Sequence, residues 1–171
     1  MKVLGIFALS CVLVPLAPAE TRPSVDRFVV QSLVRPAAGG VALHWAVVGA
    51  HHRLEQPGCR GLLSEFSDTS GRTLQENLDA LGETGGTYLA LILFADGSDR
   101  RRCKGDDAYA FTTPGSRVVY VCGRAFKNLA DRNPVTAQAI VIHEALHTLG
   151  LGENPPSSSV ITARVLAGCR S

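Results

Sequence analysis

Three features are scarce in this sequence of 171 residues, and each scarcity excludes a class of protein. No two cysteines have the CxxC spacing, which argues against a structural zinc ribbon. Basic residues barely outnumber acidic ones, 17 to 15, so neither nucleic acid nor an anionic membrane surface is an expected partner. The only dense basic cluster, residues 100–102, lacks interleaved aromatics and is interpreted as a solvated loop. Repeats and low-complexity segments are also absent, and the length suits one compact domain.

A long apolar run occurs only at the amino terminus. Residues 3–16 are apolar, a lysine precedes them and a small-residue Ala-Pro-Ala sequence follows, which is the pattern of a secretory signal peptide. We therefore predict a signal peptide at residues 1–19 and a single secreted or periplasmic domain at residues 20–171. The run is short for a membrane span, so no stable membrane insertion is expected after its removal. Lipidation of Cys11 is the weaker alternative, because the residues before it match that processing poorly.

Four cysteines follow the predicted signal peptide: Cys59, Cys103, Cys122 and Cys169. An even number in an exported chain favours two disulfides. Three pairings are possible, and we prefer Cys103 with Cys122, which flank one loop, and Cys59 with Cys169, which would tie an early element to the tail. The cysteines are accordingly interpreted as bridges and not as metal ligands.

The spacing of apolar residues predicts an α+β fold with a short mixed sheet. Helices are expected at residues 57–68, 73–81, 123–130 and 134–149, with a last helix that begins at residues 157–159 and ends near Cys169. Buried strands are expected at residues 88–94 and 117–122, separated by an exposed loop at 105–115, and residues 27–34 and 41–48 are read as strand and loop. The helix at 73–81 has the strongest local signal, a capping-box spacing at its start and a glycine at its end.

The predicted helix at residues 134–149 carries an unusual combination of side chains. Asn133 is a good helix cap and Pro134 a good first residue, and the following turns are apolar on nearly all sides. Such a helix belongs at the centre of a domain. It nevertheless contains two histidines and a glutamate, and buried polar groups need partners that a metal and its water would provide.

His143, Glu144 and His147 form an HExxH motif in this helix. Residues four apart lie on one helix face, so both imidazoles can bind one cation. Glu144 stands one position beyond the first histidine, beside the metal, where it can take a proton from an activated water. Two imidazoles and a carboxylate suit Zn²⁺. The competing interpretation is a pair of core histidines hydrogen-bonded to backbone or water, with Glu144 solvated.

The run from His143 to Glu153 resembles the HExxHxxGxxH/D pattern of the metzincin metallopeptidases. The resemblance implies that Gly150 lets the chain leave the helix sharply, so that Glu153 folds back as the third metal ligand. Glutamate departs from the usual histidine or aspartate, although a His₂Glu set is sound zinc chemistry. The alternative is that Glu153 caps the turn at Asn154.

The likeness covers about eleven residues and has one clear departure. Metzincins have a methionine-containing turn under the metal, whereas the only methionine here is Met1. We therefore describe the chain as metzincin-like, a minimal zincin, and expect a small zincin-like domain around the HExxH helix. The ending HEALHTLGLGENPPSS is also similar to that of a group of predicted bacterial exported proteins, which supports export and a metal site without implying a substrate.

The motif predicts a zinc-dependent hydrolase, with peptides as the leading substrate and another amide, such as a cell-envelope component, as the alternative. Zinc would activate water, and Glu144 would pass its proton to the leaving amine. A non-enzymatic, disulfide-stabilised module with a degenerate metal site is the third hypothesis. Oligomeric state is not predictable from the sequence. The candidates for an oxyanion-stabilising donor are Tyr109, Tyr120, His44, His51 and His52, and the last two also form a candidate accessory metal pair.

Overall fold

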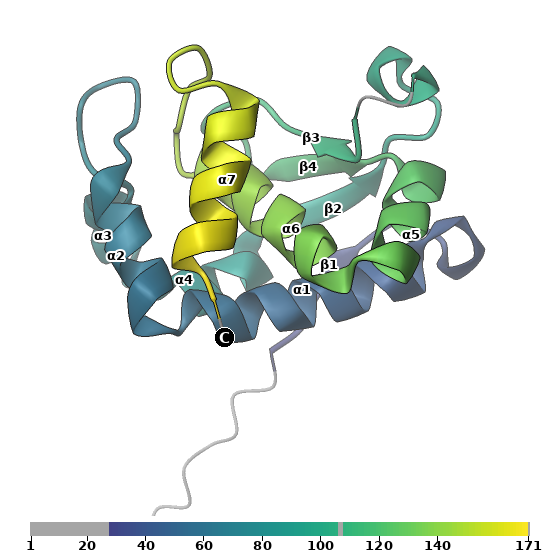
Figure 1. Cartoon of the computed structure of the whole chain (residues 1–171), viewed down its shortest axis with the longest axis horizontal. Coiled ribbons are helices and arrows are strands. Elements are labelled where there is room, and N and C mark those ends of the chain that lie inside the picture. The colour runs from purple at the N-terminus through teal and green to yellow at the C-terminus, as the bar shows by residue number, and fades with distance from the viewer. Residues whose placement is uncertain (1–27, 106–107, 171) are drawn as a thin grey trace, which may run out of the picture.

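The structure is a computed structural model that describes residues 28–105 and 108–170. The predicted signal peptide and Cys11 lie outside these residues. The helices are α1 (Gly40–Leu54), α2 (Pro57–Glu65), α3 (Leu74–Leu81), α4 (Gly85–Tyr88), α5 (Gly123–Arg132), α6 (Pro134–Thr148) and α7 (Ser158–Gly168), with short 3₁₀ turns at Pro36–Ala38, Leu89–Leu91 and Arg101–Lys104, the last called η3. The strands are β1 (Gln31–Ser32), β2 (Leu93–Asp96), β3 (Ala110–Phe111) and β4 (Val118–Val121). The predicted α+β class is confirmed (Figure 1).

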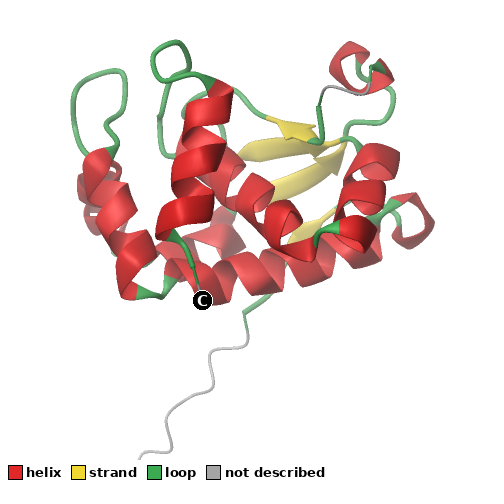
Figure 2. Cartoon of the chain, in the orientation of Figure 1, coloured by secondary structure: helices red, strands yellow, loops and turns green. Residues whose placement is uncertain are grey.

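The four strands form one mixed sheet in the order β1-β2-β4-β3. β1, β2 and β4 run parallel, and β3 is antiparallel to β4. Phe94 of β2 pairs with Val119 of β4, and both side chains are buried. The short strands lie right of the centre of the view, with helices to the left of, below and to the right of them (Figure 2). In this strand order the two longer strands, β2 and β4, are central in the sheet, and β1 and β3 are its edges.

Helix α1 contradicts the prediction of strand and loop at residues 41–48. Gly39 has φ +104°, and its carbonyl accepts a hydrogen bond from the amide of Leu43, which starts the helix. A side chain at Gly39 would meet the carbonyl oxygen of Gly123 at 2.6 Å, so the glycine allows the close approach of α5. The glycines that resemble a break in the sequence are a helix start. Leu43, Ala46 and Val47 of the apolar patch are buried in the core, whereas Val41 and Trp45 are exposed.

Three further predictions at residues 27–34, 88–94 and 105–115 were wrong in extent. Strand β2 begins only at Leu93, because α4 and a 3₁₀ turn occupy the preceding residues. Tyr88 lies in α4, where its hydroxyl donates to Thr148 Oγ1 at 3.1 Å. The predicted loop at 105–115 contains β3, and the extended segment at 27–34 contributes only the two residues of β1.

The other helix and strand predictions are confirmed within a few residues. Thr73 and Glu76 form the capping box of α3, and Gly82 ends that helix in the left-handed conformation. Helix α2 stops at Glu65, three residues before its predicted end. Strand β4 and helices α5, α6 and α7 lie where the sequence places them. Helix α6 packs against α1, α5, α7 and the β3–β4 pair, and so occupies the centre of the fold (Figure 1).

Two disulfides join the four cysteines in the preferred pairs. Cys59–Cys169 connects α2 to the end of α7, and Cys103–Cys122 connects η3 to the end of β4. Disulfides of this kind indicate an oxidising environment, extracellular or periplasmic. None of the helices within residues 28–105 and 108–170 combines the length and the apolar character that a membrane span requires.

Candidate metal centre

The HExxH residues lie on the buried central helix, as predicted. Asn133 caps α6, since its side chain accepts a hydrogen bond from the Thr136 amide at 3.0 Å, and Pro134 opens the first turn. His143, Glu144 and His147 are all buried, with no more than 6% of any residue exposed. The helix therefore fixes the spacing of the three side chains before any ligand binds.

The turn after α6 reverses the chain at Gly150. This residue has φ +110°, and the Leu151 amide donates to the carbonyl of Leu146 at 3.1 Å. A Cβ atom at Gly150 would lie 2.9 Å from the Cβ of Asp68, so both the backbone conformation and the space require glycine. The reversal brings Glu153 back over the helix.

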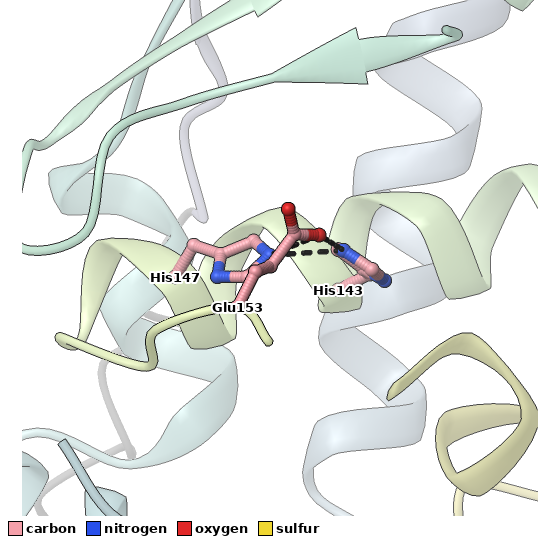
Figure 3. Close-up of side chains that lie close together, drawn as sticks. All are labelled: His143, His147 and Glu153. Atoms are coloured by element: carbon pink, nitrogen blue, oxygen red, sulfur yellow. Dashed lines mark hydrogen bonds and ion pairs between the residues drawn. The ribbon is translucent and has the colours of Figure 1, made fainter. Parts of the chain in front are cut away.

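Three donor atoms converge above α6. His143 Nε2 and His147 Nε2 lie 3.0 Å apart, and Glu153 Oε1 lies 3.8 Å from the first and 3.5 Å from the second. Figure 3 shows the carboxylate of Glu153 directed towards both rings. This group can bind a metal ion, because two imidazoles and a carboxylate are a common ligand set and all three atoms lie within 4.8 Å of one another.

Each imidazole is held through its second nitrogen. His147 Nδ1 lies 2.7 Å from the carbonyl oxygen of Leu151, and His143 Nδ1 lies 2.9 Å from the hydroxyl of Thr162 in α7. A carbonyl can only accept, so His147 carries its proton on Nδ1 and keeps the Nε2 lone pair free for a metal. Outer partners of this kind orient metal-binding histidines. The sequence analysis predicted neither of these two hydrogen-bond partners.

The Gly150 turn is also held by Asn77 of α3 and by Asp68, which lies between α2 and α3. Asn77 Nδ2 donates to the carbonyl oxygen of Leu149 at 2.9 Å and to Asp68 Oδ2 at 3.0 Å. Asp68 forms a β-bridge with Leu151. Hydrogen bonds from the side chains of Ser70 and Asn77 hold the pKa of Asp68 well below its usual range. A charged, fully hydrogen-bonded carboxylate therefore anchors the turn that carries Glu153.

Glu144 lies beside the three donors in a cavity of about 440 Å³. Its side chain is buried, and Oε2 has no hydrogen-bond partner among the described residues. Burial raises the pKa of Glu144 to about 8, Glu153 adds to the rise, and Arg102 opposes it. Burial, with the neighbouring His147, lowers the pKa of His143 to about 4. The cavity thus favours a neutral imidazole and leaves one carboxyl oxygen free for a ligand.

The structure separates the five candidate oxyanion donors. Tyr109 lines the cavity with Glu144. Tyr120 instead stacks on Phe111 at a centroid distance of 5.3 Å, outside the set of cavity-lining residues. The three histidines of α1 do not line the cavity either.

Those histidines have separate surroundings. His51 stacks on Phe28 at 4.3 Å and meets the ring of His52 edge-on, and His44 makes an edge contact with Trp45. Within the described ranges, the potential metal-binding side chains that lie together in a group of three are those of His143, His147 and Glu153, and α1 carries no such cluster. The candidate pair His51 and His52 therefore has no third ligand there.

No family model, curated protein or solved structure matches the chain. The functional argument consequently rests on the geometry of the metal centre and its cavity.

Proposed function

We propose that this protein is an exported zinc-dependent hydrolase of amide bonds and that peptides are its substrates. The observation that carries the proposal is the convergence of His143, His147 and Glu153 beside Glu144, whose buried Oε2 has no partner among the described residues. A structural metal site has no use for a free carboxyl group next to its ligands, whereas a hydrolytic one needs a base there.

The donor set favours zinc. Two histidines and a glutamate, with a position left open to a cavity, are the composition of catalytic zinc sites. A zinc ion bound there supplies Lewis acidity, which activates water and polarises an amide carbonyl. The order of HExxH helix, glycine turn and acidic third ligand supports a zincin-like arrangement of the site.

Glu144 acts in this proposal as the general base and then as the general acid. Its carboxyl group takes a proton from the attacking water and delivers it to the nitrogen of the leaving amine. Tyr109, which lines the same cavity, is the donor best placed among the candidates to stabilise the oxyanion.

The edge strand β3 favours peptides over other amides. Ala110 and Phe111 of β3, with the following Thr112, line the cavity, and β3 pairs on one side only within the four-stranded sheet. An extended peptide can add to such an edge by backbone hydrogen bonds. Strands β2 and β4 each have a neighbour on both sides and offer no such edge.

Zinc content of purified variants tests the metal centre. We expect about one zinc per chain in the wild type, loss of zinc in His147→Ala and weaker binding in Glu153→Ala. His52→Ala is the matched control, because His52 is exposed on α1, away from the cavity. Zinc retained equally by all variants would rule out the proposed ligands.

The Glu144→Gln variant tests the chemistry. It should keep its zinc and lose peptide hydrolysis by a factor of about 100 or more, because the base is removed and the ligands are not. A Glu144-dependent activity on envelope amides without peptide cleavage would support the alternative substrate. A biological function that persists unchanged in Glu144→Gln would indicate a non-enzymatic module.

A further inference from the structure

Arg102 brings a permanent positive charge to the candidate active-site cavity. It lines that cavity together with Glu144, His143 and His147, and no other arginine or lysine of the described chain does so. The sequence analysis interpreted residues 100–102 as a solvated loop. Because Arg102 lines the cavity, this residue needs a different interpretation.

The position of Arg102 is held by two neighbours. The next residue, Cys103, is bridged to Cys122 at the end of β4. The guanidinium carbon of Arg102 lies 5.5 Å from the ring centroid of Phe111 in β3, a cation–π distance. Arg102 is an exposed residue, but its guanidinium is thus held against the edge strand β3 at the rim of the cavity.

The charge of Arg102 has no protein partner among the described residues. The ion pairs of that part of the chain join other groups, and the carboxylates lining the cavity, Glu144 and Glu153, are not within 4.0 Å of the guanidinium. Ser158, the first residue of α7, lines the same cavity, and the first amides of a helix also favour negative charge.

We propose that Arg102 forms a specificity subsite for a carboxylate of the substrate, next to the bond that is cleaved. The guanidinium can bind a carboxylate through two parallel N–H groups, which fixes orientation as well as charge. The carboxylate belongs to an acidic side chain or to the carboxyl terminus of a peptide. This inference rests on the proposed hydrolase function, since the subsite adjoins Glu144 and the metal ligands.

Peptide binding to the zinc-loaded Glu144→Gln protein tests the subsite without requiring turnover. A fluorescent, uncharged peptide with an amidated end is compared with versions that carry Glu, Gln or Lys at successive positions, and with one that has a free carboxyl terminus. We expect one carboxylate-bearing peptide to bind about tenfold more tightly than its neutral counterpart, because a charge-assisted hydrogen bond is added. Which peptide gains shows the source of the carboxylate.

Variants of Arg102 in the same background assign that gain to this side chain. Arg102→Ala should abolish the preference, and Arg102→Glu should reverse it in favour of the Lys peptide. Arg101→Ala is the matched control, because Arg101 is exposed in the same turn and does not line the cavity. A carboxylate preference that is absent, or that survives Arg102→Ala, would overturn the subsite.

The same peptides incubated with the wild-type protein separate this proposal from the previous one. Hydrolysis without any preference for a carboxylate would leave the hydrolase intact and refute the subsite. Binding that depends on Arg102 without hydrolysis of any peptide would support the subsite and refute peptide cleavage.

Discussion

At the scale of single residues, the two histidines of the candidate metal centre differ in how they are held. The partner of His147 is a backbone carbonyl, that of Leu151, which no side-chain substitution removes. The partner of His143 is the hydroxyl of Thr162, which lies 19 positions further along the chain. The support of His143 can therefore be removed by one substitution that leaves all three ligands in place.

Thr162→Val removes this hydroxyl and keeps the shape of the side chain. We expect zinc affinity to fall about tenfold, because an outer partner orients the imidazole and raises its basicity. A competition titration with a chromophoric chelator measures the change, and circular dichroism should show an unchanged fold. Ser159→Ala, at an exposed position of the same helix, should bind zinc like the wild type. Equal affinities for all three proteins would contradict the assigned role of Thr162.

Sequence reasoning identified the three residues of the candidate metal centre but not the groups that hydrogen-bond to the two histidines. The spacing of His143 and His147 identifies one helix face, and Gly150 explains how Glu153 can return to it. The carbonyl of Leu151 is invisible in a sequence, since every residue has one. The role of Thr162 is equally hard to predict from the sequence, because its hydroxyl meets His143 only when α7 packs on α6.

At the scale of elements, the metal centre depends on the contact between the α6 turn and the segment before α3. Gly150 lies against Asp68, and Asn77 of α3 holds the carbonyl of Leu149. Helix α6 supplies two of the candidate ligands and the turn supplies the third. Any shift of the turn therefore changes the distance between Glu153 and the histidines.

Gly150→Ala should disturb this contact in two ways. The positive φ disfavours a side chain, and the new Cβ would lie 2.9 Å from that of Asp68. We expect a loss of about 3 kcal/mol in the free energy of unfolding, measured in urea, together with weaker zinc binding.

The matched control for this substitution is Gly82→Ala at the end of α3. Gly82 also has positive φ, at +69°, but an added Cβ meets no atom within 4 Å. The expected cost is about 1 kcal/mol with zinc affinity unchanged. Equal costs for the two variants would show that the contact with Asp68 is unimportant.

Elements with local signals were predictable, and elements set by distant contacts were not. The capping box at Thr73 and the cap at Asn133 are short-range patterns, and α3 and α6 begin there. Helix α1 was missed because Gly39 resembles a break in the sequence. In the structure, the missing side chain of Gly39 lets Gly123 of α5 approach closely, a distant contact that the sequence does not reveal. Strand β3, with only two residues, has no periodicity to detect.

At the scale of the whole molecule, the two disulfides close loops of very different length. Cys59 and Cys169 are separated by 110 positions, whereas Cys103 and Cys122 are separated by 19. The longer closure restricts the unfolded chain more, so its contribution to stability is larger in the chain-entropy description.

The double variants Cys59→Ala/Cys169→Ala and Cys103→Ala/Cys122→Ala test this order. We expect the free energy of unfolding to fall by about 5 kcal/mol in the first and about 3 kcal/mol in the second. Urea titrations of the zinc-free proteins measure both values without a contribution from metal binding. A larger loss in the second variant would contradict the loop-length argument.

Helix α7 connects the Cys59–Cys169 disulfide to the candidate metal centre. It carries Thr162 against His143 and ends at Cys169, which is bonded to α2. In a chain that is still reduced, nothing covalent would fix this helix, so the imidazole would lose part of its orientation. We therefore expect maturation to follow a sequence, with thiol oxidation first and full metal affinity acquired afterwards, so that the newly made chain competes poorly for zinc before it is oxidised.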